Sequence, residues 1–284
     1  MKIIITPRDA MQGLKPFIPT TVKADYINCL LKVGFDTIDF GSFVSPKAIP
    51  QLRDTSEVIK KLDLSSTATK LLAIIGNFKG AEIGSQFEEI SYFGYPFSTS
   101  PTFLKRNINT TIKDAYSTIE DIQNLCVKIK KELVIYFSMP FGNPYGDKHN
   151  DEMVLKAVEK LKKLHIKTIS LADTVGIGDN AIIAGLFSHL VAEFSDIEFG
   201  LHLHVKKSEA PGKIDSAYKA GCRHFDTALL GLGGCPMSGE KMVGNLSTEQ
   251  LVKYLEINKL NVPLDKNKLK NAVAKADEVF SFWK

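Results

Sequence analysis

Short runs of apolar and β-branched residues alternate with longer amphipathic stretches along the whole chain. The short runs have the length of strands, and the longer stretches place apolar residues three and four positions apart, as helices do. The pattern predicts eight strands, at residues 2–6, 37–40, 70–75, 89–93, 133–138, 167–171, 198–204 and 224–228. Helices are expected at 21–33, 111–131, 151–164, 179–194 and 208–220, the third of them N-capped by Asn150.

Strands that alternate with helices predict a parallel sheet, because parallel neighbours need a crossover connection. About eight such units without an obvious linker predict a closed (β/α)8 TIM barrel. An open doubly wound sheet is the competing fold, but no Gly-x-Gly-x-x-Gly motif follows the first strand. We therefore expect one α/β barrel domain over residues 1–284 with an extra C-terminal helical segment. Residues 248–257 and 265–282 are both helix-like, and we interpret them as the last barrel helix followed by this C-terminal addition.

Composition and charge narrow the classes of function. The net charge of +4 is mild, and no long run of like charges favours a nucleic-acid partner. The four cysteines, at 29, 126, 222 and 235, show no Cys-x-x-Cys spacing, which favours reduced thiols. The first residues lack the features of a signal peptide, and no apolar run is long enough to span a membrane. The expected location is therefore the cytoplasm, with no membrane partner.

Candidate chemical groups follow the predicted strands in order. In a β/α barrel, catalytic side chains lie where strands end and the following loops begin. Those positions hold a consistent set of polar residues: Arg8, Asp9, Asp39, Asp173, His202, His204, Cys235 and Asn245. They belong to the ends of the first, second, sixth, seventh and eighth strands, which meet at one face of a closed barrel.

His202-Leu203-His204 is the sharpest of these elements. The two-residue period of a strand puts both imidazoles on one face, about 6.6 Å apart along it. One imidazole packed in the barrel and one solvated would be the plain alternative. However, the first strand of a closed barrel lies near the seventh, so Asp9 can reach the same point. A carboxylate, two imidazoles and the amide oxygen of Asn245 suit Mg²⁺ or Mn²⁺ better than structural zinc, which favours thiolate ligands.

Arg8 and Cys235 are candidates for the reaction itself. A surface ion pair between Arg8 and Asp9 would contribute little, whereas a guanidinium at a barrel mouth can stabilise a developing enolate oxygen. Cys235 lies in the glycine-rich sequence GLGGCP, which is either an ordinary turn or a loop that presents an exposed thiol. Because cysteine prefers burial, an exposed thiol there is a candidate acid or base.

Motifs along most of the chain resemble the 3-hydroxy-3-methylglutaryl-CoA lyases, within a wider group of barrel metallolyases and condensing enzymes. Pro7-Arg8-Asp9, with Gln12 and Lys15, is similar to the opening motif of that family. The further matching segments are SFVSPK (42–47), KRNIN (105–109), SLADTVGIG (170–178), the two histidines, GLGGCP (231–236) and Gly244-Asn245. The combination of GLGGCP and SFVSPK, in this order, points to the lyases rather than to the synthases.

The resemblance implies metal-dependent cleavage of 3-hydroxy-3-methylglutaryl-CoA to acetyl-CoA and acetoacetate, in leucine and ketone-body metabolism, by a homodimer. It implies Mg²⁺ or Mn²⁺ bound by Asp9, His202, His204 and Asn245. It also implies Arg8, Asp39, Asp173 and Cys235 as catalytic or supporting residues, and Arg8, Gln12, Lys15 and Ser42 as residues that bind the acyl-CoA substrate.

The sequence departs from the family pattern at four places, one of which is the whole region Phe78–Pro101. Asp39 stands where the family carries a glutamate, Val205 to Ser208 replace Asp-Thr-Tyr-Gly, and Asn143 replaces a cysteine. Two alternatives therefore stay open: a related acyl-CoA condensing synthase, and a metal-binding paralogue with weakened catalysis. The substitution Asp39→Glu has two sensible outcomes. If neighbouring groups have moved to compensate for the shorter side chain, glutamate would overpack the site and lower turnover. If the site is slightly loose, glutamate would raise turnover, and we expect this second outcome.

Overall fold

Eight parallel strands close into a barrel in their sequence order, with the eighth strand paired to the first. The structure is a computed structural model that describes residues 1–234 and 243–282. The strands are β1 (Lys2–Ile5), β2 (Thr37–Ser42), β3 (Lys70–Ile74), β4 (Ile90–Ser98), β5 (Glu132–Ser138), β6 (Thr168–Asp173), β7 (Glu198–Leu203) and β8 (His224–Thr227). Each predicted strand is present, so the expected TIM barrel is confirmed.

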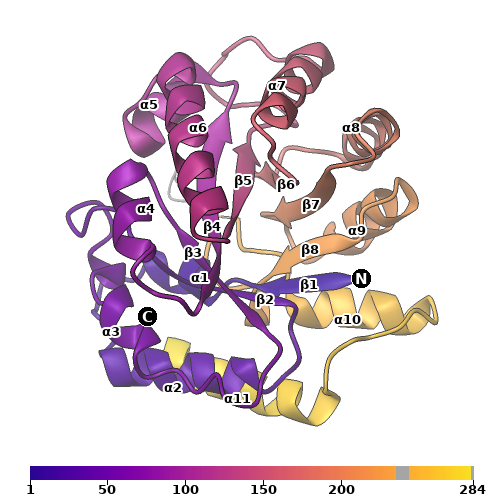
Figure 1. The fold of residues 1–284 in the computed structure, drawn as a ribbon. Helices are drawn as coiled ribbons and strands as arrows, with labels where there is room; N and C mark the ends of the chain where they lie inside the picture. The colour runs from indigo at the N-terminus through magenta and orange to yellow at the C-terminus, as the bar shows by residue number, and fades with distance from the viewer. Residues whose placement is uncertain (235–242, 283–284) are drawn as a thin grey trace.

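Helices surround the barrel on the outside, as Figure 1 shows. The longer ones are α2 (Thr20–Leu31), α6 (Ile112–Lys128), α7 (Asp151–Lys163), α8 (Asn180–Glu193), α9 (Ala210–Lys219), α10 (Thr248–Ile257) and α11 (Lys266–Phe282). The shorter ones are α1 (Pro7–Gln12), α3 (Thr55–Ile59), α4 (Phe78–Gly84), α5 (Pro101–Ile108) and the 3-10 helices η1 (Pro50–Leu52) and η2 (Leu229–Gly231). The predicted N-cap is confirmed, since the side chain of Asn150 accepts a hydrogen bond from the backbone N–H of Met153.

The side chains on the two faces of each strand belong to two different layers, one between the barrel and its helices and one inside the barrel. On β5, Leu133, Ile135 and Phe137 belong to the main core between the barrel and its helices. The alternate residues Val134 and Tyr136 point into the interior of the barrel, where they form a separate apolar cluster with Leu72 of β3. The period of two along each strand therefore builds both layers at once.

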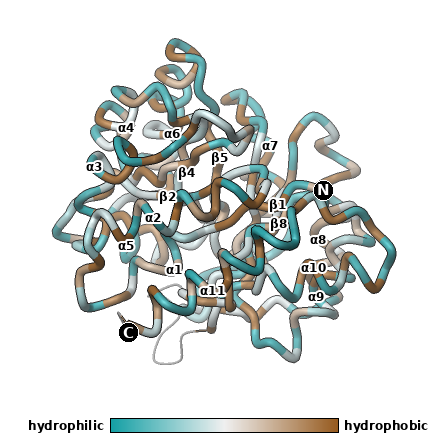
Figure 2. The backbone as a smooth tube through the Cα atoms, turned by 90° about the horizontal axis from the view of Figure 1, so that it is seen from below, coloured by the Kyte–Doolittle hydropathy of each residue, from teal (hydrophilic) through white to brown (hydrophobic). Residues whose placement is uncertain are grey.

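The C-terminal helix α11 packs along α2, and the two lie side by side in Figure 1. The rings of Tyr26 and Phe280 meet edge to face there, with their centroids 5.8 Å apart. Brown and teal segments alternate along the outer helices in Figure 2, as expected for helices with one buried face. Within the part of the chain that the structure describes, no helix is long and apolar enough to cross a membrane.

Two predicted boundaries were wrong in ways that affect the site. The fourth strand continues past Phe93 to Ser98, since Pro96 pairs with Tyr136 in the ladder despite its missing N–H. The second strand extends past Phe40 to Ser42, which places Asp39 within the strand rather than at its end. The ladder between β2 and β3 is irregular between Asp39 and Gly41.

Candidate metal centre and active site

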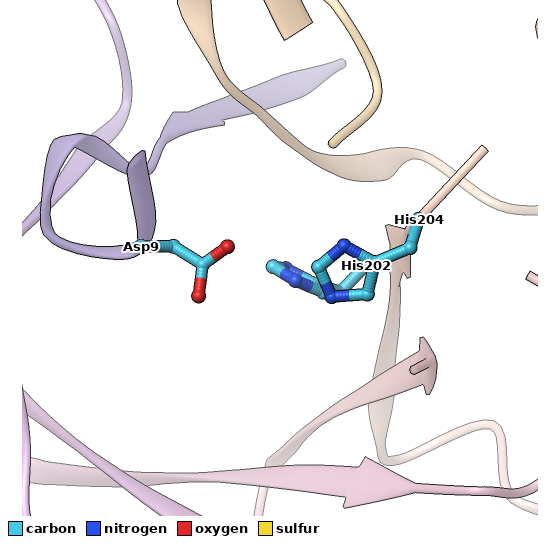
Figure 3. A group of neighbouring side chains, drawn as sticks. All are labelled: Asp9, His202 and His204. Atoms are coloured by element: carbon cyan, nitrogen blue, oxygen red, sulfur yellow. The ribbon is translucent and has the colours of Figure 1, made fainter. Parts of the chain in front are cut away.

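Asp9, His202 and His204 converge at the mouth of the barrel where the strands end. Asp9 lies in α1, directly after β1, while His202 lies near the end of β7 and His204 one residue beyond it. Potential ligand atoms of the three side chains all lie within 4.8 Å of one another, and all three residues are buried. In Figure 3 the carboxylate of Asp9 points across toward the two imidazoles.

The electrostatics of Asp9 and His204 fit a divalent cation. Burial and the neighbouring His202 lower the pKa of His204 to about 4, so its imidazole is neutral near pH 7, as a ligand must be. Its buried Nδ1 has no hydrogen-bond partner among the described residues. Burial opposes the charge of Asp9, but Arg8 and the histidines lower its pKa to about 2. A buried carboxylate beside an unpaired imidazole nitrogen has the chemistry of a metal site.

Arg8 is held in place by the acidic groups around it. Its Nε donates to both carboxylate oxygens of Asp39, at 3.0 and 3.2 Å, and its Nη2 lies 2.6 Å from Asp39 Oδ2. Its Nη1 donates to Asp9 Oδ1 at 3.0 Å and to Gln12 at 2.9 Å. Burial opposes the cation, but Asp39 and Asp9 outweigh it and raise the pKa of Arg8. The guanidinium is therefore permanently charged and fixed in orientation.

Asp39 contacts the site through Arg8. Its carboxylate is fully buried. This burial raises the pKa of Asp39 to about 6, while the cation of Arg8 opposes the rise and keeps the group ionised near pH 7. With both oxygens accepting from Arg8, Asp39 orients the guanidinium, which is the role that the geometry gives it.

Two amide side chains bracket the Asp9 carboxylate. Gln12 Nε2 donates to Asp9 Oδ1 at 2.7 Å, and Asn245 Nδ2 donates to Asp9 Oδ2 at the same distance. Asn245 Nδ2 also donates to the carbonyl of Leu232 at 2.8 Å. Both of these hydrogen bonds use the amide nitrogen of Asn245 as the donor. Its amide oxygen, Oδ1, is the atom that could bind a metal ion.

Several residues that the sequence singled out lie apart from this cluster. Asp173 accepts hydrogen bonds from the backbone of Ile177 and Gly178 and from the buried Lys213, so it stabilises the loop after β6. Ser42 donates to a backbone carbonyl of β3, and Lys15 is exposed to solvent. Cys235 lies outside the described residues.

Asp226 is a residue that sequence reasoning missed. It lies on β8, and its Oδ2 is 3.1 Å from His202 Nδ1 and accepts from Ser170 Oγ. Burial and Asp226 act on His202 in opposite directions, and the carboxylate prevails and raises the pKa of His202. The available signal was the alternation His224-Phe225-Asp226, which puts two polar side chains on one face of a buried strand.

A cavity of about 560 Å³ opens beside the cluster. Its lining includes Arg8, Asp9, His202 and His204, together with the apolar side chains of Val44, Ile49, Ile74, Phe103 and Ile108. A cavity lined both by this polar cluster and by apolar side chains suits a substrate that has a reactive polar group and an apolar part.

Comparisons with known proteins identify the family. The HMGL-like family model matches residues 3–275. The chain is 32% identical over 266 residues to the hydroxymethylglutaryl-CoA lyase of Bacillus subtilis, covering 92% of this chain and 87% of the relative. It superposes on the solved HMG-CoA lyase of the same organism with a TM-score of 0.92 and 30% identity, covering 99% and 93% of the two chains.

A second solved relative is an HMG-CoA lyase from Acinetobacter baumannii in complex with coenzyme A and 3-methylmalate. It has a TM-score of 0.90 and 30% identity, covering 99% of this chain and 91% of that one. The family model and these relatives each span most of the chain, and the cluster of Asp9, His202 and His204 occurs at the barrel mouth within the matched region. The chain belongs to the HMGL-like family.

Proposed function

We propose that this protein is a carbon–carbon lyase that cleaves 3-hydroxy-3-methylglutaryl-CoA to acetyl-CoA and acetoacetate. The observation that carries the proposal is the convergence of Asp9, His202 and His204 beside a fixed Arg8, in a chain of the HMGL-like family. The acyl-CoA class of substrate is supported by the relative that was solved with coenzyme A, and the partly apolar cavity agrees with it.

The proposed cofactor is Mg²⁺ or Mn²⁺, held by Asp9, His202 and His204 with the amide oxygen of Asn245. When bound, such an ion supplies a Lewis acid that polarises oxygen atoms of the substrate. The ligand types favour these ions, because one carboxylate and two imidazoles leave positions free for oxygen ligands. Asp9 is already ionised and His204 already neutral near pH 7, so binding requires little change of protonation at these two groups.

Cleavage breaks the bond between C2 and C3 of the acyl chain. The C3 hydroxyl loses its proton and becomes the ketone of acetoacetate, while the electron pair of the broken bond moves to the thioester as an enolate. Arg8, oriented by Asp39, stabilises the enolate oxygen with its fixed positive charge. Protonation of the enolate carbon then yields acetyl-CoA. This proton balances the one lost from the C3 hydroxyl, so the reaction neither takes up nor releases a proton overall.

Cys235 is the proposed proton donor to the enolate carbon. This role rests on its place in the GLGGCP sequence, two residues after Gly233. A Cβ added to Gly233 would lie 2.8 Å from the backbone oxygen of Asp9 and from Asn245 Nδ2, so this glycine lies beside the site. Replacement by alanine should lower kcat by a factor of about 10² to 10⁴ and change KM little, because proton transfer contributes in the transition state. An unchanged kcat in Cys235→Ala would remove the thiol from the mechanism.

The direct test is to incubate the Mn²⁺-loaded protein with 3-hydroxy-3-methylglutaryl-CoA and to measure acetoacetate and acetyl-CoA. We expect equal amounts of both products, and none after the ion is removed by a chelator. Condensation of acetyl-CoA without cleavage would favour a synthase, and no reaction in either direction would favour a paralogue without catalysis. The cytoplasmic location and the homodimer stay predictions, the latter testable by analytical ultracentrifugation.

A further inference from the structure

A chain of charged side chains crosses the interior of the barrel and ends at the metal site. Lys2 Nζ lies 2.6 Å from Glu198 Oε2, and Glu198 Oε1 lies 2.8 Å from His224 Nδ1. His224 Nε2 is 3.2 Å from Asp226 Oδ1, and Asp226 Oδ2 is 3.1 Å from His202 Nδ1. We call these five residues the ionic chain.

The ionic chain runs from one end of the barrel to the other. Lys2, Glu198 and His224 begin their strands, and they line a cavity of about 430 Å³ at the end of the barrel opposite the metal site. His202 lies near the end of β7, in the cavity that holds the candidate metal site. The interiors of such barrels are usually filled by branched apolar residues, so a charged column is a departure that requires a reason.

The buried charges of the ionic chain lower the stability of the fold unless each group is paired. Asp226 is 2% exposed and His224 7% exposed, whereas the side chains of Lys2 and Glu198 are 45% and 36% exposed. A buried charge is tolerated when it is paired and hydrogen-bonded, and removal of one partner leaves the other uncompensated. Asp226 is paired on both sides, with His224 at one oxygen and His202 at the other.

The barrel makes room for His224 in one orientation. A Cβ added to Gly200, on the neighbouring strand β7, would lie 2.8 Å from Cδ2 of the His224 ring. The absence of a side chain at Gly200 lets the ring lie against that strand, with its two nitrogens directed to Glu198 and to Asp226. Both ring nitrogens face carboxylates, so each donates a proton. Burial opposes this charge, but the two carboxylates raise the pKa of His224 to about 9.

We propose that His224 and Glu198 are positioning residues for the metal site. They hold Asp226 so that it accepts the Nδ1–H of His202, which directs His202 Nε2 to the ion. The hydrogen bond to a ligating histidine fixes its tautomer and ring orientation, and the loss of such a partner typically lowers metal affinity by a factor of 10 to 100. His224 acts one bond further away, through Asp226, and Glu198 through His224.

The inference rests on the proposed metal site but does not require the proposed reaction. It is tested by titrating the whole protein, without substrate, with Mn²⁺ and following bound ion by electron paramagnetic resonance. We expect His224→Leu to raise the Kd for Mn²⁺ at least about tenfold and Glu198→Gln to raise it severalfold. Lys2→Met should change the Kd less than about twofold, because exposed ion pairs contribute little.

Two further variants separate positioning from a general loss of structure. Val134→Ala opens a space in the apolar part of the same interior and should leave the Kd unchanged while lowering stability. His224→Gln keeps an N–H donor for Asp226 and should restore most of the affinity that leucine loses. In Asp226→Asn, the change His224→Leu should no longer affect the Kd, because the route through Asp226 is already broken.

The outcomes distinguish this inference from the proposed function. The positioning role is wrong, and the lyase proposal stands, in either of two cases. In the first, the His224→Leu variant binds Mn²⁺ as tightly as the unchanged protein. In the second, His224→Leu raises the Kd for Mn²⁺ by the same factor in the Asp226→Asn variant as in the unchanged protein. If the unchanged protein binds Mn²⁺ and the variants weaken it as expected, but 3-hydroxy-3-methylglutaryl-CoA is not cleaved, the lyase proposal fails alone. If a variant does not fold, as judged by circular dichroism, His224→Gln and Glu198→Gln decide the question.

Discussion

The interior of the barrel is divided into two unlike halves. On the side of β3 to β5, Leu72, Val134 and Tyr136 form an apolar cluster. On the side of β6 to β8, the same interior holds Ser170, His202, His224 and Asp226, joined by hydrogen bonds. The residues of both sets are buried, and both sets alternate along their strands with residues of the main core. Only the second set is polar, whereas packing alone would favour apolar side chains in a barrel interior.

The difference separates what stabilises the fold from what serves the site. Burial of a leucine or valine stabilises the folded state by about 1.5–3 kcal/mol. A buried charged pair often contributes less than a packed apolar pair of the same volume. The polar half is therefore best explained by its contact with the candidate metal ligand His202 at the mouth of the barrel. The following substitutions test whether the apolar half serves stability and the polar half serves the metal site.

The largest effect should come from a ligand at the mouth. Asp9→Ala removes the carboxylate and should lower turnover by a factor of about 10³ or more, because metal Lewis acidity is worth several kcal/mol. The barrel should stay folded, since Asp9 lies in α1, outside the strands. Steady-state kinetics with Mn²⁺ and thermal unfolding measure the two quantities, with the exposed Asp25→Ala as the control. Turnover within tenfold of the unchanged protein would contradict the ligand assignment.

Arg8→Lys should lower kcat by a factor of about 10² to 10³, because lysine keeps the charge but not the fork of donors that Asp39 orients. The matched control is Arg223→Lys, an exposed arginine at the opposite end of the barrel, which should leave kcat unchanged. Equal kcat values for the two variants would show that charge alone, without the geometry of the Asp39 pair, is sufficient.

In the apolar half, Leu72→Ala should lower the free energy of unfolding by about 2–5 kcal/mol, as expected for a buried leucine that leaves a cavity. Urea denaturation measures this loss. The Kd for Mn²⁺ should change less than about twofold, since Leu72 belongs to the apolar cluster and not to the ionic chain. A weaker metal affinity in this variant would mean that the two halves are not independent.

The smallest effect is expected for Asp39→Glu. The structure favours overpacking over repair of a loose site, because Asp39 is fully buried and already pairs with Arg8 through both oxygens. An added methylene typically costs about 1–3 kcal/mol of folding stability in such a place. Because it would also displace Arg8, turnover should fall about tenfold. Kinetics of this variant and of Asp39→Asn decide the point. A rise in turnover for glutamate would restore the outcome that the sequence led us to expect.

The sequence predicted the fold well because periodicity is a local property. All eight strands and the long helices were predicted from apolar spacing, whereas α1, α3, α4 and α5 were missed because they are too short to show a helical period. The strand β4 was predicted five residues too short at its end (93 instead of 98), because Gly94 and Pro96 are poor signals for a strand.

The site was predicted only in part, for a physical reason. Asp9, His202 and His204 could be grouped because the order of strands in a closed barrel brings their ends together. The pairing of Arg8 with Asp39 and the link from His202 to Asp226 depend on register and side-chain direction across neighbouring strands. Those are properties of the assembled barrel, and no local pattern in one strand specifies them.

The central claim is that Asp9, His202 and His204 hold one divalent cation. The most direct measurement is a crystal structure of the protein grown with Mn²⁺, with anomalous difference density collected near the manganese absorption edge. The account predicts one strong peak at the barrel mouth, about 2.0–2.2 Å from an Asp9 oxygen and from one nitrogen of each imidazole. A peak elsewhere, or none at a concentration that supports turnover, would contradict it.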